Sequence, residues 1–236
     1  MSDDVLRPFP KPLKQRLWKT VTEYFAMLVL QHCFPSQYST LEKGESPDLQ
    51  SPDHRVGVEV TLAVSQREAQ LDSQYYRAHT NPDTDTPPLG LLQLPGEVER
   101  EMASTSHTDP ISALAQEKLI WQNALRKKMK KLPYYQTRGF QQLHLFVVYE
   151  EPPIPVPQSV WKEWVEEVLA DYQDCYEIIY ICYLCGLLMY EADPQTLQII
   201  HLDRRDICQL KCQARRMVEQ LDTQQAEKGV SLHSSG

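Results

Sequence analysis

The chain has 236 residues, of which 42% are hydrophobic and 24% are charged, and its formal net charge is −8 at pH 7. This composition matches a soluble globular protein, so it excludes a disordered chain and predicts a substantial hydrophobic core. The length fits one large α/β domain, or one domain with an insertion and a tail. The acidic balance argues against a surface devoted wholly to nucleic acid, although a local basic patch remains compatible with it.

The chain shows no signal for export or for membrane insertion. Its first residues, "MSDDVLRPFPKPLKQRLW", lack the apolar segment and cleavage site of a signal peptide. Uninterrupted apolar runs also stay below the roughly 18 residues that suggest a membrane span. We therefore expect a cytoplasmic protein whose six cysteines are thiols.

In the first half of the chain, the sequence predicts a helix, two strands and an irregular segment. Apolar residues recur at helical spacing over residues 14–33, and "SQYSTLEKG" (36–44) is expected to form a strand. The clearest strand is "RVGVEVTLAV" (55–64), which is rich in β-branched residues. Over residues 70–109 periodicity fades among Pro, Asn, Asp and Gly, which predicts either a partly helical insertion or a functional flap.

The second half of the chain alternates helices and strands. A long helix is expected over residues 109–132, with Asp109 as N-cap and Pro110 at its first position. An apolar strand over 141–150 has the composition of a strand covered on both faces. Four elements are expected to follow: a helix capped by Ser159, a strand over 176–184, a hairpin turning at 192–195, and a last helix over 205–228.

This order of elements predicts the fold class. Helices that alternate with continuously apolar strands favour a three-layer α/β/α sandwich around a central mixed sheet. We expect residues 1–150 to form its core, with the loop-rich insertion at about 70–109. Residues 151–236 would form the C-terminal part of the same domain and end in a flexible tail.

Two carboxylates lie on either side of a predicted turn. Asp48 follows Pro47, and Glu59 lies in the apolar strand between Val58 and Val60. Because strand side chains alternate, Glu59 points away from the face of the two valines, and a buried carboxylate there needs a partner or a metal. Two converging carboxylates suit a hard divalent cation. The alternative is an edge strand that exposes Glu59 to solvent.

The long helix supplies candidate cations for these carboxylates. At about 100° per residue, Lys118 lies on the apolar stripe of the helix and Lys128 on its flank. Lysine is rarely placed there unless its stem packs along apolar surface or its ammonium has an anionic partner, so either ammonium could point at the carboxylates. The outward-facing basic residues either bind a phosphate backbone or form a solvated helix end; they are Arg126, Lys127, Lys130 and Lys131.

Four cysteines have spacings that occur in zinc sites. Cys182 and Cys185 form a C-x-x-C pair, and Cys208 and Cys212 lie four apart on a predicted helix. The first pair lies in the apolar run "EIIYICYLCGLLMYE", where cysteine behaves as a small hydrophobic residue. This setting favours buried thiols over a structural zinc site.

Together these residues resemble the PD-(D/E)xK nuclease superfamily, which has the restriction-endonuclease-like fold. Its motif is Pro-Asp, a variable gap, then Asp or Glu, any residue and Lys on a strand. Pro47-Asp48 and Glu59-Val60-Thr61 occupy those places, and the expected order of elements over residues 14–150 is also similar. Asp53 offers a second register, but only six positions separate it from Glu59, which leaves room for little more than a turn. Asp48 is therefore preferred.

The resemblance implies roles for individual residues. Asp48 and Glu59, with the carbonyl of Val60, would bind Mg²⁺ or Mn²⁺, and Glu23 resembles the supporting acid that many members carry on the first helix. Thr61 departs from the motif, since it stands where the family has lysine. Some members carry that lysine on the following helix, where Lys128 is our first candidate and Lys118 our second. The lysine would orient the attacking water or stabilise the charge on the phosphate.

Three functional hypotheses follow. The first is a Mg²⁺-dependent nuclease that hydrolyses DNA phosphodiesters, and the second is a catalytically inactive nuclease-like domain that binds nucleic acid or protein. The third is a zinc-supported interaction module built on Cys182, Cys185, Cys208, Cys212 and His201. The oligomeric state stays open, a homodimer included.

Overall fold

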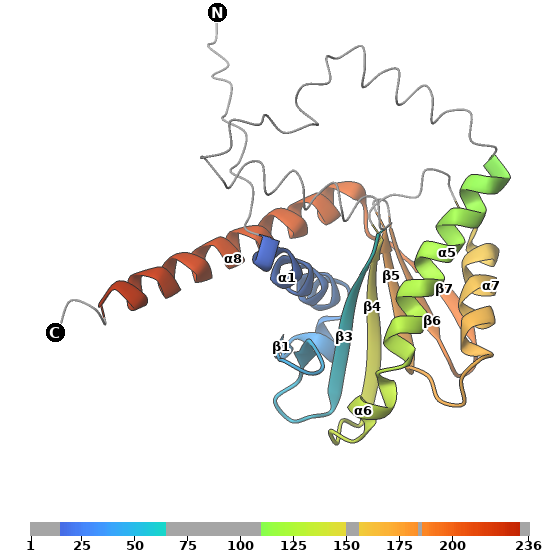
Figure 1. Ribbon diagram of the computed structural model, residues 1–236, viewed down its shortest axis with the longest axis horizontal. Helices are drawn as coiled ribbons and strands as arrows, with labels where there is room; N and C mark the ends of the chain where they lie inside the picture. The colour runs from blue at the N-terminus through green and yellow to red at the C-terminus, as the bar shows by residue number, and fades with distance from the viewer. Residues whose placement is uncertain (1–14, 65–109, 150–155, 184–185, 232–236) are drawn as a thin grey trace, which may run out of the picture.

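The computed structural model describes residues 15–64, 110–149, 156–183 and 186–231. These residues form one open seven-stranded sheet, in the order β1-β2-β3-β4-β5-β6-β7, with helices on both faces (Figure 1). The predicted α/β class with a central mixed sheet is confirmed. The expectations for the insertion at about 70–109, with the Asp109 cap, and for the end of the tail lie outside the described residues.

The sheet is parallel at its centre and antiparallel at both edges. β3 pairs in parallel with β4, and β4 pairs in parallel with β5, whereas all other neighbours are antiparallel. The parallel strands are apolar along most of their length because helices cover both of their faces. The strands are β1 (Glu42–Lys43), β2 (Leu49–Gln50), β3 (Val56–Ala63), β4 (Gln142–Tyr149), β5 (Ile178–Tyr183), β6 (Gly186–Glu191) and β7 (Thr196–Ile200).

Two layers of helices enclose two hydrophobic cores. The helices are α1 (Gln15–Cys33), α2 (Pro35–Tyr38), α5 (Pro110–Met129), α6 (Leu132–Gln136), α7 (Gln158–Leu169) and α8 (Arg204–Ser231). Helices α1 and α8 pack together on one face, and α5 and α7 cover the other (Figure 1). Val58 and Val60 of β3 point into the first core, so Glu59 between them points toward the α5 layer.

Most predicted elements are confirmed, and three local expectations are wrong. The segment 36–44 is not one strand, because Pro35 begins the short helix α2 and only Glu42–Lys43 is extended. Ser159 is not an N-cap, since α7 begins at Gln158 after Pro157. The long helix ends at Met129 instead of reaching residue 132.

Two further observations concern the membrane and the cysteines. Among the described residues, no helix is long and apolar enough to cross a bilayer. Cys182 is buried in the first core, whereas Cys208 and Cys212 are exposed on α8. Cys185 lies outside the described residues.

Candidate active site

Asp48 is held in place by a short hairpin beside β3. The backbone N–H of Gly44 donates to the carbonyl of Asp48 at 2.8 Å and closes the loop between β1 and β2. The loop lies close against β3 because residue 57 is glycine: a Cβ there would come within 2.7 Å of the Pro47 ring. Leu49 is fully buried in the first core, which fixes the strand immediately after Asp48. The carboxylate is therefore presented by a constrained backbone.

Glu59 and Val60 lie where the pairing between β2 and β3 stops. On β3, β2 pairs only with Gly57 and Val58. The peptide groups of Val60 are therefore hydrogen-bonded by side chains on that side of the strand instead of by β2. Asp48 Oδ2 accepts the N–H of Val60 at 2.9 Å, and Lys128 Nζ donates to its carbonyl at 2.7 Å. Glu59 is buried, with 3% of its surface exposed, so the alternative of an edge strand that exposes this carboxylate is wrong.

Lys128 comes from the last turn of α5 and points at both carboxylates. Its Nζ lies 2.6 Å from Glu59 Oε1 and 3.9 Å from Asp48 Oδ2. These two oxygens are therefore at most 6.5 Å apart, the sum of those two distances. Trp121, Leu125 and Met129 are buried along the same side of the helix and fix its orientation over the sheet. Packing of α5 thus delivers the ammonium to the carboxylates.

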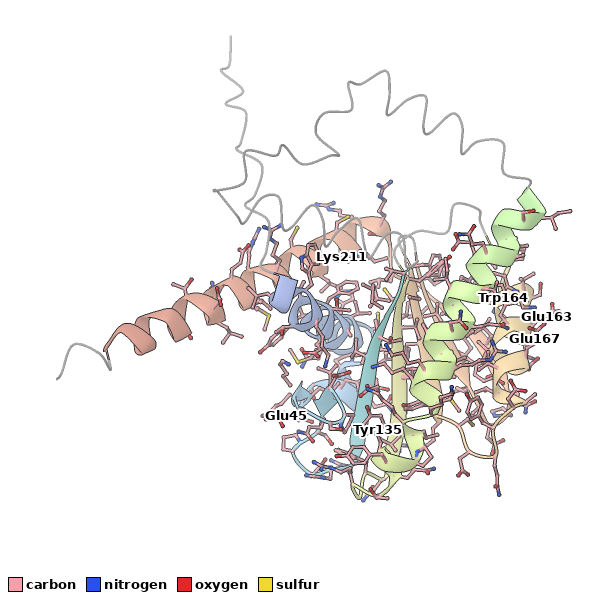
Figure 2. The ribbon with its side chains drawn as sticks, in the orientation of Figure 1. Glu45, Tyr135, Glu163, Trp164, Glu167 and Lys211 are labelled. Carbon is pink, nitrogen blue, oxygen red and sulfur yellow. The ribbon has the colours of Figure 1, made fainter. Side chains whose placement is uncertain are left out.

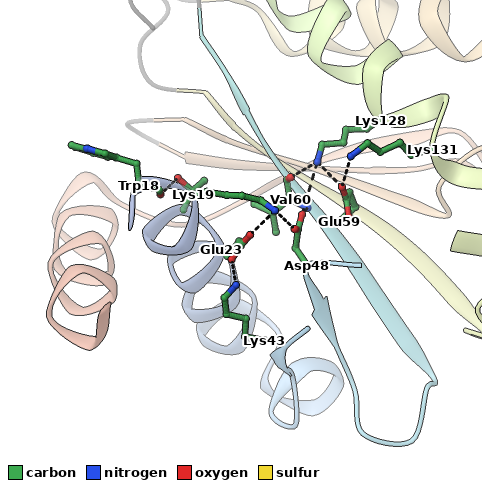
Figure 3. Close-up of polar contacts among 10 residues, drawn as sticks. Trp18, Lys19, Glu23, Lys43, Asp48, Glu59, Val60, Lys128 and Lys131 are labelled. Carbon is green, nitrogen blue, oxygen red and sulfur yellow. Dashed lines mark hydrogen bonds and ion pairs between the residues drawn. The ribbon is translucent and has the colours of Figure 1, made fainter. Parts of the chain in front are cut away.

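Three more lysines surround this pair, as Figure 3 shows. Lys19, from α1, lies 3.0 Å from Asp48 Oδ1 and 3.2 Å from Glu23 Oε1. Lys43, from β1, donates a hydrogen bond to the other oxygen of Glu23. Lys131 lies 3.9 Å from Glu59 Oε1. The buried carboxylates of Glu23, Asp48 and Glu59 are thus each in contact with at least one partly exposed lysine ammonium.

The electrostatic environment keeps Asp48 ionised. Burial alone would raise the pKa of Asp48, but the Val60 N–H and the ammonium groups of Lys19 and Lys128 together lower this pKa below its ordinary value. Partial burial alone would lower the pKa of Lys19, but its bonds to Asp48 and Glu23 raise it instead. Burial and the hydrogen bond to Glu59 raise the pKa of Tyr135, so its phenol stays protonated beside the carboxylate. The site therefore holds the ionised Asp48 carboxylate, the Lys19 ammonium and the neutral Tyr135 phenol together.

The oxygen atoms of this site suit a hard divalent cation. Glu59 Oε1, the Val60 carbonyl and Asp48 Oδ2 lie 2.6, 2.7 and 3.9 Å, respectively, from the Lys128 ammonium. Mg²⁺ is commonly held by one or two carboxylates with water completing its shell, so two carboxylates and a carbonyl fit it. No group of three or more acidic, histidine or cysteine side chains in metal-binding arrangement occurs in the described part of the chain. The donor set thus includes a main-chain carbonyl.

The structure places other predicted site residues elsewhere. Lys118 does not reach the carboxylates, because its Nζ lies 2.7 Å from Glu167 Oε1, on α7. Figure 2 labels Glu167 on that helix and Tyr135 near the lower end of β3. Asp53 pairs with Arg55 on the surface, which agrees with the preference for Asp48. Lys118, the second candidate for the displaced motif lysine, is therefore not a neighbour of Asp48 and Glu59.

The predicted basic run on α5 divides into three parts. Lys127 and Lys130 are exposed, as expected for a surface that could meet phosphates. Arg126 is half-buried and its Nη2 lies 3.7 Å from Asp171 Oδ2, just after the end of α7, so it belongs to the contact between these two parts of the chain. Lys131 is half-exposed but also approaches Glu59. Within this basic run, the exposed side chains are therefore those of Lys127, Lys130 and Lys131.

Sequence reasoning did not single out two residues of this site, Lys19 and Lys43. Lys19 lies four positions before Glu23 on α1, a spacing that places two side chains side by side on a helix and could have suggested the pair. Lys43 carries no comparable signal, since it reaches Glu23 only through the folded position of β1.

Comparison of this chain with models of known protein families, with curated proteins and with solved structures found no match. The function must therefore be inferred from the chemistry of the site itself.

Proposed function

We propose that this protein is a metal-dependent nuclease with a restriction-endonuclease-like core, which hydrolyses DNA phosphodiesters. The observation that carries the proposal is the convergence of Glu59 Oε1, the Val60 carbonyl and Asp48 Oδ2 on one cationic group. A buried cluster of this kind is costly to maintain for stability alone, because desolvation of the charges offsets most of their attraction. A carboxylate such as Asp48, whose pKa is shifted by burial and by specific charged partners, is a candidate for a functional site.

In this proposal each side chain has a distinct task. Asp48 and Glu59 supply the carboxylate ligands, and a bound Mg²⁺ or Mn²⁺ would supply a hydroxide nucleophile at neutral pH and polarise the phosphate. Lys128 stabilises negative charge that develops on the phosphate, because its ammonium lies in a water-poor site where such interactions are strong. Glu23 acts in support, by holding Lys19 beside Asp48.

The surface around the carboxylates suits an anionic substrate. Lys19 and Lys131 expose 72% and 52% of their side chains while they approach the buried carboxylates. They come from α1 and from the segment that joins α5 to α6, so they stand on either side of Asp48 and Glu59 (Figure 3). Exposed ammonium groups in this position would attract a phosphate backbone in spite of the acidic net charge.

Cleavage of a supercoiled plasmid in the presence of Mg²⁺ or Mn²⁺ tests the proposal. We expect the wild-type protein to nick or linearise the plasmid and Asp48→Asn to lose about 10²-fold or more of this activity. Asp53→Asn is the matched control, because Asp53 lies in the turn between β2 and β3 and pairs with Arg55 on the surface, away from Glu59. Wild-type activity in Asp48→Asn, or none in the wild type with either ion, contradicts the proposal.

A second candidate function is a nuclease-like domain that binds nucleic acid without cutting it. Two observations favour it: Thr61 replaces the motif lysine, and the ammonium of Lys128 already donates to Glu59 Oε1 and to the Val60 carbonyl. The same assay separates the candidates when it is paired with anisotropy measurements on a labelled duplex in EDTA. A protein that binds the duplex but leaves the plasmid intact with both ions supports the second candidate.

A further inference from the structure

The ammonium of Lys128 stands where a divalent cation would have to bind. Nζ lies 2.6 Å from Glu59 Oε1, 2.7 Å from the Val60 carbonyl and 3.9 Å from Asp48 Oδ2. A metal ion bound to the same oxygens, at about 2.0–2.6 Å, would occupy nearly the same point. Two cations this close repel each other strongly in a poorly hydrated site. These oxygens can therefore bind one cation at a time.

We propose that Lys128 and a divalent cation are alternative occupants of this site, so that metal binds only when the Lys128 ammonium moves away. This inference rests on the metal site of the proposed function and adds a control on its loading. When the ammonium occupies the site, it compensates the charge of the buried carboxylates. When the metal binds, a doubly charged ion replaces the singly charged ammonium of Lys128.

The displaced ammonium needs a new anionic partner. Lys128 is anchored at the end of α5, where the Tyr176 hydroxyl donates to its main-chain carbonyl at 3.2 Å, so only its side chain can move. The Tyr135 hydroxyl beside Glu59 is neutral, and among the described residues the other charged side chains close to the two carboxylates are the cations Lys19 and Lys131. A substrate phosphate between them would accept the ammonium. Metal and phosphate should therefore bind cooperatively, because each favours the outward position of Lys128.

Direct measurement of Mn²⁺ affinity by isothermal titration calorimetry tests this exchange. We expect Lys128→Met to bind Mn²⁺ at least tenfold more tightly than the wild-type chain, because methionine has a similar length and carries no competing charge. Lys118→Met is the matched control, since Lys118 lies on the same helix but pairs with Glu167 on α7 instead of with the two carboxylates. It should change the affinity less than twofold. Adding Glu59→Gln to Lys128→Met should abolish the gain if Mn²⁺ binds at this site.

A second variant covers the case in which Lys128→Met does not fold. Lys128→Gln keeps a donor for the Val60 carbonyl but removes the charge, and we expect it to bind Mn²⁺ at least threefold more tightly than wild type. Equal or weaker Mn²⁺ binding in a folded Lys128 variant overturns the proposal. This readout is independent of DNA cleavage: a chain that binds Mn²⁺ as expected but leaves DNA intact contradicts only the nuclease function.

Discussion

Lys118 and Lys128 lie on the same helix, and each forms an ion pair with a glutamate at a similar distance. The Nζ atoms lie 2.6 Å from Glu167 Oε2 and 2.6 Å from Glu59 Oε1, respectively. The surroundings differ, because the side chains of the first pair are 31% and 40% exposed, whereas those of the second are 9% and 4% exposed. Sequence spacing alone favoured Lys118 as the more inward residue.

The difference shows that burial determines what an ion pair can do. In the exposed pair, water competes for both charges and the contact contributes little. In the buried pair, each charge depends on its partner, since neither can recover its hydration. A buried pair of this kind adds little to the free energy of unfolding. It does suit a functional site, because its cation and carboxylates are already positioned for a ligand. The following predictions test this comparison, from the largest expected effect to the smallest.

Removal of Glu59 should destabilise the protein strongly. Glu59→Ala leaves the Lys128 ammonium buried without its closest carboxylate, and we expect a loss of about 3–5 kcal/mol in the free energy of unfolding. Urea unfolding in EDTA, followed by tryptophan fluorescence, measures the loss. Glu167→Ala is the matched control on the exposed pair and should cost at most about 1 kcal/mol.

A double-mutant cycle sharpens this result. The combination of Glu59→Ala with Lys128→Met removes both charges, so it should cost less than the sum of the two single changes. If the loss in the free energy of unfolding for the double variant equals the sum of the losses for the two single variants, the two charges do not depend on each other. The role assigned to burial would then be wrong.

His144 offers a buried group with no opposite charge beside it. Its Nδ1 lies 2.8 Å from the Tyr38 hydroxyl, and its Nε2 has no hydrogen-bond partner among the described residues. Burial lowers the pKa of His144 to about 4, from an ordinary value of 6.5. The neutral ring is therefore the form that the fold accepts, in contrast to the charged Lys128 with its carboxylates.

The lowered pKa predicts a loss of stability in mild acid. Between the ordinary and the lowered pKa, the unfolded chain binds a proton that the folded chain does not, so stability falls as the pH decreases from about 6.5 toward 4. Between pH 7.5 and pH 5 this residue should account for about 2 kcal/mol. Urea unfolding at both pH values measures it, with His144→Gln as the control. The same pH dependence in both proteins would contradict the assignment.

The sequence predicted those parts of the molecule that depend on local pattern. The β-branched run of β3, the apolar β4 and the hairpin from β6 to β7 all follow from periodicity and turn residues. The segment 36–44 was wrong because Pro35 and the burial of Tyr38 outweigh its strand propensity. Tertiary contacts that no local window contains, such as the hydrogen bond between Tyr38 and His144, decide such segments.

The residues of the candidate site also fall into two groups: those that local pattern predicts and those that only tertiary contacts determine. Asp48 and Glu59 could be found because a short turn brings neighbouring strands together, and the structure places them side by side. The choice between Lys118 and Lys128 could not be made from helical periodicity, because it depends on where α7 lies. Glu167 on that helix binds Lys118, and only the position of α7 in the folded chain determines this contact.

The smallest expected effect is on Lys118 itself. Lys118→Ala removes the exposed pair with Glu167, yet Gln122 Nε2 still donates to Glu167 Oε2 at 2.8 Å and keeps that carboxylate partnered. We expect a loss of no more than about 0.5–1 kcal/mol in urea unfolding, decreasing as salt screens the pair. Nuclease activity and Mn²⁺ affinity should stay at the wild-type level, because the ammonium does not reach Asp48 or Glu59. A large loss of either property would mean that Lys118 acts on the site through α5, and the two lysines would then not be independent.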